Sequence, residues 1–234
     1  MSSPYQDVKD TLLDAALTHV PFDGWSETTF RAAVSDSGVD AGLARAAFPR
    51  GAIDLALAFH DRGDQAMLAA LSAADLNGMK IREKIAFAVK SRIEAAEDKE
   101  AVRRGTTLFA LPQYAPDGAR AIWGTADLIW DGIGDMSEDY NWYTKRAILS
   151  GVYSSTVLFW LGDDSLDHQA TWDFLDRRIA NVMQIEKLKA QVNENPLLKT
   201  FMIGPNWVLS HIKAPARASR SDLPGSWTSP GPGA

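Results

Sequence analysis

Apolar residues fall at helical spacing along Trp172-Asp-Phe-Leu-Asp-Arg-Arg-Ile-Ala-Asn-Val-Met-Gln-Ile-Glu-Lys-Leu-Lys-Ala-Gln-Val192. The large ones recur at steps of three and four, so they line one face of an α-helix. They are Trp172, Leu175, Ile179, Val182, Ile185, Leu188 and Val192. A second stripe has the same spacing, and no comparable stretch alternates with the two-residue period of a strand. It comprises Ile81, Ile85, Ala88 and Arg92.

Proline is absent from residues 50–111 and 117–195, so nothing in these stretches forces a helix to end. Ser26 and Asp40 are typical N-caps, and Asp167 is a third candidate, before Trp172. The predicted helix ends are Gly38, Gly63 and Gly162. We therefore expect an all-α protein of about nine or ten helices.

The composition is that of an ordinary soluble globular protein. The 234 residues are 46% hydrophobic and 23% charged, which favours one compact domain with appendages. The absence of cysteine excludes disulfides, a thiol nucleophile and iron–sulfur clusters. A net charge of −6 argues against a protein whose main work is coating nucleic acid. The longest charge-free apolar stretch, residues 147–162, is shorter than the ~20 residues of a spanning helix, and we interpret it as a buried helix.

Motifs for catalysis are missing. The sequence has no Glu-x-x-His, no Gly-x-Ser-x-Gly and no phosphate-binding loop. His168 alone has acidic neighbours, Asp164 and Asp167, which permits a metal or acid–base site. A solvated helix entry with capping carboxylates explains the same residues more simply. We expect no enzyme activity, no metal and no cofactor.

Two short helices joined by a glycine turn are expected near the N-terminus. Residues 28–37 precede Gly38, and Asp40 caps a second helix that Pro49 closes. This helix-turn-helix pattern resembles the first helices of TetR-type regulators. The expected reading face is mostly alanine, and residues 22–62 carry four Arg against six acidic residues. Its exposed positions are expected to be Ala41, Gly42, Ala44, Ala46 and Ala47. We therefore predict that the unit does not bind DNA.

Four further stretches, in order, carry a more specific resemblance. They are Arg104-Gly-Thr-Thr-Leu-Phe-Ala-Leu-Pro112, Ile122-Trp-Gly-Thr-Ala-Asp127, Asn141-Trp-Tyr-Thr-Lys-Arg-Ala147 and Trp172-Asp-Phe-Leu-Asp-Arg-Arg-Ile179. With the TetR-like unit they make the chain similar, over about residues 10–213, to the family of the ubiquinone (coenzyme Q) biosynthesis accessory protein, the ninth Coq protein. The resemblance implies a TetR-like helical bundle without catalysis. Such a protein binds isoprenoid quinone intermediates at a membrane and presents them to the demethoxyubiquinone hydroxylase.

The charge-free helix is the expected lipid-binding element. Small residues alternate there with large apolar ones, which would let a long apolar ligand lie between helices. The predicted lipid-binding residues, for an isoprenoid quinone or a phospholipid, are Val152, Thr156, Phe159 and Trp160. The alternative is that this helix is simply the centre of the bundle.

Large aromatic residues lie beside cations at the start of the same helix. Exposed Trp and Tyr next to Arg are typical of interface hot spots, although Trp at a helix start also packs in cores. In the resembled family this stretch is part of the surface that docks the hydroxylase. The matching positions here are Asp139, Trp142, Tyr143 and Arg146. Adjacent helical residues point about 100° apart, so at least one of the two aromatics should be exposed.

The segment after residue 192 is apolar and basic, which suits a helix in the headgroup region of an anionic membrane. The predicted membrane-binding residues are Leu197, Leu198, Phe201, Met202, Trp207, Leu209 and Ile212. The competing interpretation is that they cover the core of this chain or of a dimer partner. Gly204-Pro205 interrupts any continuous helix.

We thus expect a helix-turn-helix unit over 7–62, a lipid-binding bundle over 63–192, a membrane segment over 193–213 and a flexible tail over 214–234. A homodimer is expected. The first residues resemble no signal or transit peptide, which favours the cytoplasmic face of a bacterial inner membrane. A mature mitochondrial form, at the matrix face, would look similar. The alternative function is a TetR-type ligand-responsive repressor.

Overall fold

The computed structural model describes residues 4–96, 98–137, 140–194 and 214. Over these residues the chain forms ten α-helices and one short 3₁₀ helix, without strands, so the expected all-α class is confirmed. The N-terminal helices are α1 (Pro4–Leu17), α2 (Val20–Asp23), α3 (Glu27–Ser37) and α4 (Ala41–Ala47). The remaining elements are α5 (Ala52–Ala73), α6 (Ile81–Glu94), α7 (Lys99–Phe109), α8 (Ala115–Gly132), α9 (Tyr140–Leu161), η1 (Leu166–His168) and α10 (Gln169–Glu194).

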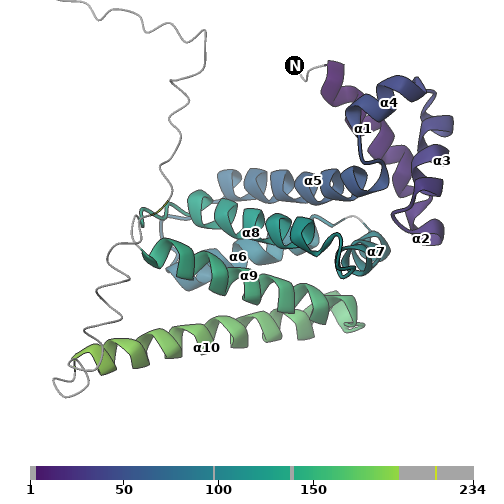
Figure 1. Ribbon diagram of the computed structural model, residues 1–234. Coiled ribbons are helices and arrows are strands. Elements are labelled where there is room, and N and C mark those ends of the chain that lie inside the picture. Colours follow the sequence, from purple (N-terminus) through teal and green to yellow (C-terminus); the bar gives the residue numbers. More distant parts are fainter. Residues whose placement is uncertain (1–3, 97, 138–139, 195–213, 215–234) are drawn as a thin grey trace, which may run out of the picture.

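The helix α5 joins two hydrophobic cores. Its first half contributes Leu55 to a core built on α1–α4, and its second half contributes Met67 to the core of the larger bundle. Figure 1 shows α1–α4 gathered at one end, with α5, α8, α9 and α10 forming the body. The expected boundary between residues 62 and 63 therefore lies inside one helix. None of the described helices is long and apolar enough to cross a bilayer.

Helix termini follow the expected chemistry at the helix-turn-helix unit. Ser26 Oγ accepts a hydrogen bond from the backbone N–H of Thr29, and Asp40 caps α4 through the N–H of Leu43. Gly38 ends α3 with a left-handed φ of 67°. These positions confirm the predicted caps.

Two other predicted helix termini are wrong. Gly63 lies inside α5, where a Cβ would come within 2.3 Å of Arg92 Nη1, so glycine there makes room for a packed arginine. Asp167 does not cap the last helix, because it lies in η1 with a φ of 50°. The capping carboxylate is Asp163, which accepts hydrogen bonds from the backbone N–H and the hydroxyl of Thr171. Hydrogen bonds from Thr171 and Ser165 lower the pKa of this carboxyl.

A buried polar network ties α5, α6 and α8 together. Arg92 Nε donates to Asp64 Oδ1 at 2.5 Å, and the Thr125 hydroxyl donates to the same carboxylate at 2.9 Å. His60 Nε2 lies 2.8 Å from Thr125 Oγ1. Because Asp64 and Arg92 are both buried, their pairing satisfies charges that would otherwise destabilise the core.

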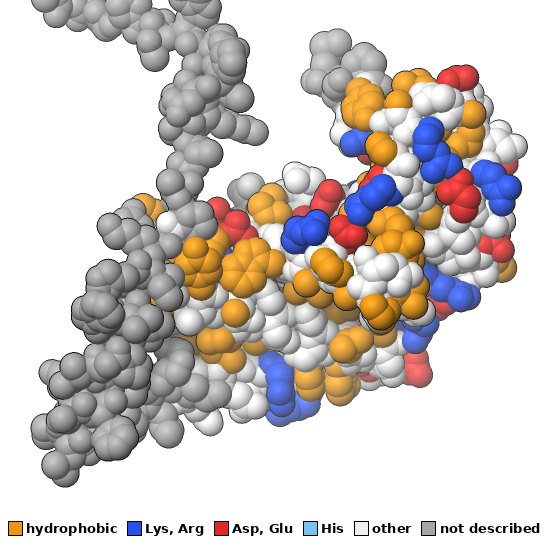
Figure 2. All heavy atoms as spheres, viewed as in Figure 1, with side chains coloured by type: hydrophobic (Ala, Val, Ile, Leu, Met, Phe, Trp, Pro, Cys, Tyr) orange, Lys and Arg blue, Asp and Glu red, His pale blue; other side chains and the backbone are white. Residues whose placement is uncertain are grey.

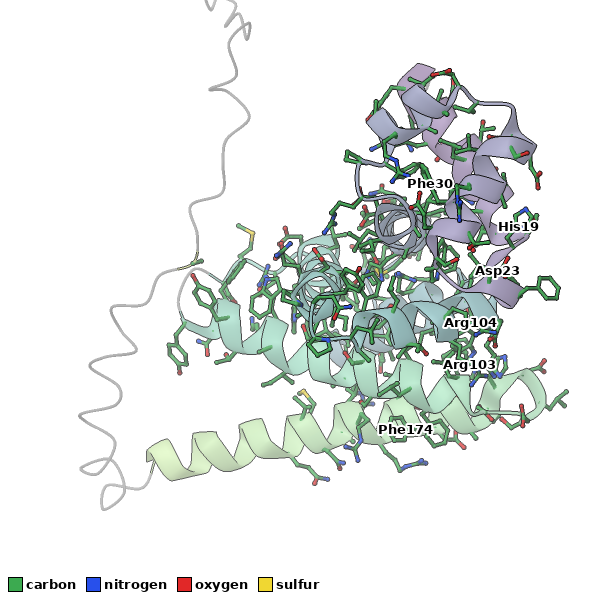
Figure 3. The ribbon with its side chains drawn as sticks, turned by 45° about the vertical axis from the view of Figure 1, so that its right-hand side comes forward. His19, Asp23, Phe30, Arg103, Arg104 and Phe174 are labelled. Atoms are coloured by element: carbon green, nitrogen blue, oxygen red, sulfur yellow. The ribbon has the colours of Figure 1, made fainter. Side chains whose placement is uncertain are left out.

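The helix α7 connects the N-terminal helices to the bundle. Arg104 donates to the Pro21 carbonyl of α2, and the Trp25 indole donates to the Ala101 carbonyl. Figure 3 shows Arg103 and Arg104 lying beneath the α2 region. On the other side, Arg103 donates to the Leu161 carbonyl at the end of α9. Side chain to backbone hydrogen bonds of α7 thus link the N-terminal helices to the end of α9.

Acid should destabilise the fold through His60. Burial, followed by the positive charge of Arg92, lowers the pKa of His60 from 6.5 to about 4. In the unfolded chain His60 therefore binds a proton below about pH 6.5, whereas in the folded chain it does so only below about pH 4. The free energy of unfolding falls as the pH drops through this window. We expect wild type to lose about 2 kcal/mol more than His60→Gln between pH 7 and pH 4.5, measured by urea unfolding. Parallel losses would assign the acid sensitivity to other groups.

Candidate functional site

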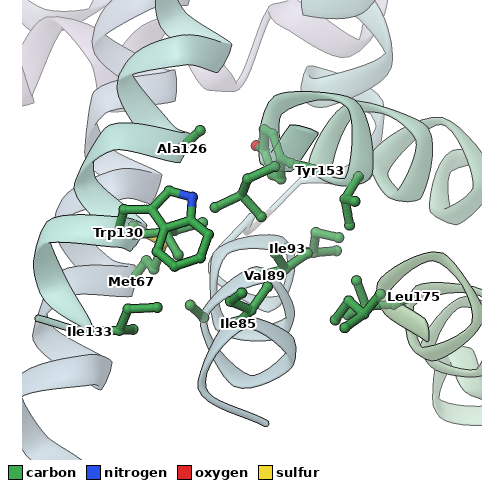
Figure 4. Close-up of a cluster of buried hydrophobic side chains, with 14 of the residues drawn as sticks. Met67, Ile85, Val89, Ile93, Ala126, Trp130, Ile133, Tyr153 and Leu175 are labelled. Carbon is green, nitrogen blue, oxygen red and sulfur yellow. The ribbon is translucent and has the colours of Figure 1, made fainter. Parts of the chain in front are cut away.

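An apolar pocket of about 330 Å³ lies inside the larger bundle. Its walls come from α6, α8, α9 and α10, and its deepest side chains belong to the bundle core. Those core members are Ile85, Trp130, Ile133, Leu149, Val152 and Ile179. Figure 4 shows Trp130 of α8, and Ile133 directly after the end of α8, facing Ile85 of α6 across this core. The volume is at the lower end of the ~300–1,000 Å³ typical of small-molecule sites.

The rim of the pocket combines exposed apolar side chains with one ion pair. Met136 is 75% exposed and Ile81 is 49% exposed, and both line the pocket. Lys145 Nζ donates to Asp135 Oδ1 at 2.7 Å and to Ser137 Oγ at 2.6 Å. Burial alone would raise the pKa of Asp135, but the hydrogen bonds from Lys145 and Ser137 and nearby positive charges lower it. These interactions therefore favour the ionised form of this carboxyl.

The predicted lipid-binding residues do not come together in this pocket. Val152 lines it. Thr156 and Trp160 are buried further along α9, and the Thr156 hydroxyl donates to the Val152 carbonyl. Phe159 is 38% exposed and stacks on Phe174 of α10 at 4.5 Å between ring centroids. The residues that the sequence reasoning missed come from α6, α8 and α10, whose helical stripes indicate burial but not an opening.

An aromatic surface lies beside the pocket, where the start of α9 packs against the middle of α8. Trp142 packs against Trp123 of α8 at 6.0 Å and edge-on against Tyr143 at 4.8 Å. Tyr143 is 36% exposed, so the expectation that one of the two adjacent aromatics is exposed is confirmed. In Figure 2 hydrophobic side chains gather on the visible face where α8 and α9 meet. We call Trp123, Trp142 and Tyr143 the aromatic surface.

Arg146 is buried beneath this surface. Its side chain is 0% exposed and contacts Asp127, Asp131 and Asp135. Its guanidinium carbon lies 4.0 Å from the centroid of the Trp142 ring. In this arrangement Arg146 orients the aromatic surface from below and is not placed to contact a partner. Asp139, the remaining predicted partner residue, lies outside the described residues.

The membrane-binding prediction also concerns residues that the structure does not describe. Leu197, Leu198, Phe201, Met202, Trp207, Leu209 and Ile212 fall in the undescribed range 195–213. The predicted tail, 214–234, is described only at Ala214.

The helix-turn-helix unit exposes few groups that suit DNA. Ala44 and Ala47 were expected on the reading face, but they are buried because they pack in the N-terminal core. Arg45 pairs with Glu27 and lies over the Phe30 ring, and Arg50 pairs with Asp54 and Asp117. Arg45 on α4 and Arg50 just after it are thus each paired with carboxylates of the same chain.

The described residues show no metal-binding cluster. No group of three or more His, Asp or Glu side chains in this part of the chain is arranged to hold a metal ion. The ring of His168 instead packs edge-on against Trp160 at 5.9 Å.

Comparisons with known proteins agree on a family. Residues 115–186 match the COQ9 family model. A ubiquinone biosynthesis protein COQ9 of Rattus norvegicus, named as mitochondrial, is 30% identical over 200 residues, which cover 80% of this chain and 62% of that protein. A COQ9 protein of Drosophila melanogaster is 29% identical, with 79% and 58% covered. The chain thus spans about three fifths of the length of these curated relatives.

A solved structure shows the fold. The TetR transcriptional regulator of Nitrosomonas europaea superposes with a TM-score of 0.62 at 18% identity, covering 74% of this chain and 97% of that one. The TetR-like fold is therefore confirmed. At this identity the likeness says nothing of DNA binding.

Replacing Arg146 tests its structural position. Arg146→Leu should lower the free energy of unfolding by about 3 kcal/mol, because it leaves three carboxylates without their shared cation. Arg178→Leu is the control, since Arg178 is exposed and its guanidinium lies over the Phe174 ring, and it should cost under about 0.5 kcal/mol. Urea unfolding of both variants measures the difference, and equal stabilities would contradict the buried position.

Proposed function

We propose that this chain, which carries a COQ9-family domain, is a lipid-binding accessory protein of ubiquinone biosynthesis. The pocket binds an isoprenoid quinone intermediate or a phospholipid, and the aromatic surface docks the demethoxyubiquinone hydroxylase to which the lipid is presented. The chain itself performs no catalysis in this proposal. The relatives' names place those proteins in ubiquinone biosynthesis. The lipid as ligand and the hydroxylase as partner are what the resemblance of the four sequence stretches implies.

The observation that carries the proposal is the shared border of the pocket and the aromatic surface. Lys145 lines the pocket, and the next residue, Arg146, holds Trp142 from below. Asp135 contacts both cations. The same carboxylate therefore lies at the rim of the pocket and holds the arginine that supports the aromatic surface. A protein that presents a lipid needs its opening close to the docked enzyme, and this arrangement provides it.

The exposed rim favours work at a membrane. Met136, Ile81 and Met183, which is 41% exposed, form an apolar edge where a lipid can enter without crossing polar side chains. We propose peripheral attachment to a membrane, at the inner face in a bacterium or at the matrix face in a mitochondrion. The predicted segment 193–213 would add to this attachment.

Mass spectrometry of organic extracts tests the lipid. Protein purified from a ubiquinone-producing host should release an isoprenoid quinone or a phospholipid. Ile148 lines the pocket, so Ile148→Trp should reduce the extracted lipid at least fivefold by filling it. Ala147→Trp is the matched control, because Ala147 is its exposed neighbour on α9 and does not line the pocket. Equal lipid in all three samples, or none in wild type, would contradict the proposal.

Pull-down of the demethoxyubiquinone hydroxylase tests the aromatic surface. Tyr143→Ala should leave the melting temperature nearly unchanged and weaken binding by roughly 30-fold or more, because a central aromatic in an interface contributes about 2 kcal/mol or more. Leu158→Ala removes a 59% exposed residue from the other end of α9 and should bind like wild type. If folded Tyr143→Ala retains full binding, the docking surface lies elsewhere.

A further inference from the structure

Exposed apolar side chains surround the mouth of the pocket. Ile81 at the start of α6, Met136 in the connection after α8 and Met183 on α10 are all exposed and all line the pocket. Met79, two residues before Ile81, is exposed as well. We call these four residues the rim patch. Apolar side chains from three segments that gather at one opening are typical of an interaction surface.

Two lysines flank the rim patch at the start of α6. Ile81 and Ile85 line the pocket, Lys80 comes directly before the first of them, and Lys84 directly before the second. Because successive helical residues point about 100° apart, Lys84 stands beside the apolar stripe rather than beneath it. The described part of the chain offers no ion-pair partner to either lysine, whereas their neighbour Arg82 pairs with Glu83 at 3.7 Å. Both ammonium groups are therefore available to an anion.

The carboxylates beside the two lysines are engaged with other groups. Among the described residues that line the pocket, Asp135 is the only acidic one, and it is bound to Lys145 at 2.7 Å. Glu83 accepts a hydrogen bond from the backbone N–H of Lys80 at 2.9 Å and pairs with Arg82. The charge that remains uncompensated at the start of α6 is thus positive.

We propose that the mouth of the pocket is the surface by which this protein docks on an anionic phospholipid bilayer. The rim patch enters the apolar layer below the headgroups, and Lys80 and Lys84 contact the lipid phosphates. Apolar side chains beside free cations provide the two attractions that hold proteins at anionic membranes. This inference rests on the proposed attachment to a membrane and deepens it, because it names the docking surface and the charge of the lipid.

The docking surface fixes the orientation of the molecule. The pocket opens toward the bilayer, so a lipid passes between them without crossing water. Figure 1 shows the second half of α10 at the end of the body away from α1–α4, which places the N-terminal helices far from the membrane. The aromatic surface lies beside the mouth, on α8 and the start of α9, and stays accessible to a partner that works at the same bilayer.

A fluorescent label tests this orientation on the full chain. The sequence has no cysteine, so one introduced cysteine carries the only nitrobenzoxadiazole group. Met136→Cys places the label at the rim patch. Leu166→Cys is the matched control, because Leu166 is exposed in η1, at the opposite end of α10. With vesicles of phosphatidylcholine and phosphatidylglycerol, lipids that carry a nitroxide should quench the label at position 136 and leave the label at position 166 unchanged.

Charge variants test the two lysines. Lys80→Gln combined with Lys84→Gln should weaken binding to the same vesicles about 30-fold, measured by co-sedimentation, at an unchanged melting temperature. Arg31→Gln combined with Arg120→Gln is the matched control, because it removes equal charge from exposed positions on α3 and near the start of α8. This control should bind within about twofold of wild type. Vesicles of phosphatidylcholine alone should bind wild type as weakly as the lysine variant binds the anionic vesicles.

The ways of failing are distinguishable. If the protein sediments with vesicles while the label at position 136 is not quenched and the lysine variant binds like wild type, the docking surface lies elsewhere and membrane attachment stands. If that label responds to rising protein concentration without vesicles, a second copy of the chain covers the rim patch and the inference is refuted. If wild type does not sediment with any vesicle, the proposed membrane attachment fails together with the inference, whereas lipid extraction still decides the ligand of the pocket.

Discussion

The buried guanidinium of Arg146 is the interaction on which both parts of the site depend. It brings carboxylates of α8 and of the connection to α9 to one point, and it supports the Trp142 ring at 4.0 Å. A fully buried arginine is costly unless its donors are satisfied, so this cluster fixes how α8 meets α9. That junction forms one wall of the pocket and the base of the aromatic surface.

A second buried ion pair fixes the packing of other helices of the bundle. Asp64 and Arg92 hold α5 to α6 with Thr125 of α8 hydrogen-bonded to the same carboxylate. Gly63 permits this close approach, since a Cβ there would overlap the guanidinium. These polar contacts therefore fix the packing of α5, α6 and α8. Apolar side chains line the opening of the pocket, near the start of α6 and the end of α8.

Helical spacing was enough to predict an all-α protein, because periodicity and caps such as Ser26 and Asp40 are local. The TetR-like arrangement was predicted from the resemblance of the helix-turn-helix pattern. Gly63 was misread since its role depends on Arg92, which is distant in sequence. The site was harder to predict, because its residues are also distant from one another in sequence. Val152 was found on its own helix, but Trp130, Ile85 and Ile179 reach the pocket from three other helices. Their spacing shows that they face inward, and only the packing shows that a space remains between them.

Sharing the TetR fold does not by itself transfer the function of a repressor, and the charges of the N-terminal helices support our prediction that they do not bind DNA. A DNA-binding head needs cations free to replace the counterions of phosphates. Here Arg45 is occupied by Glu27 and Arg50 by Asp54 and Asp117, so binding phosphate would first require breaking these pairs. The N-terminal helices instead use their side chains to hold α5 and α7. The pocket lies in the interior of the larger bundle, between α6, α8, α9 and α10.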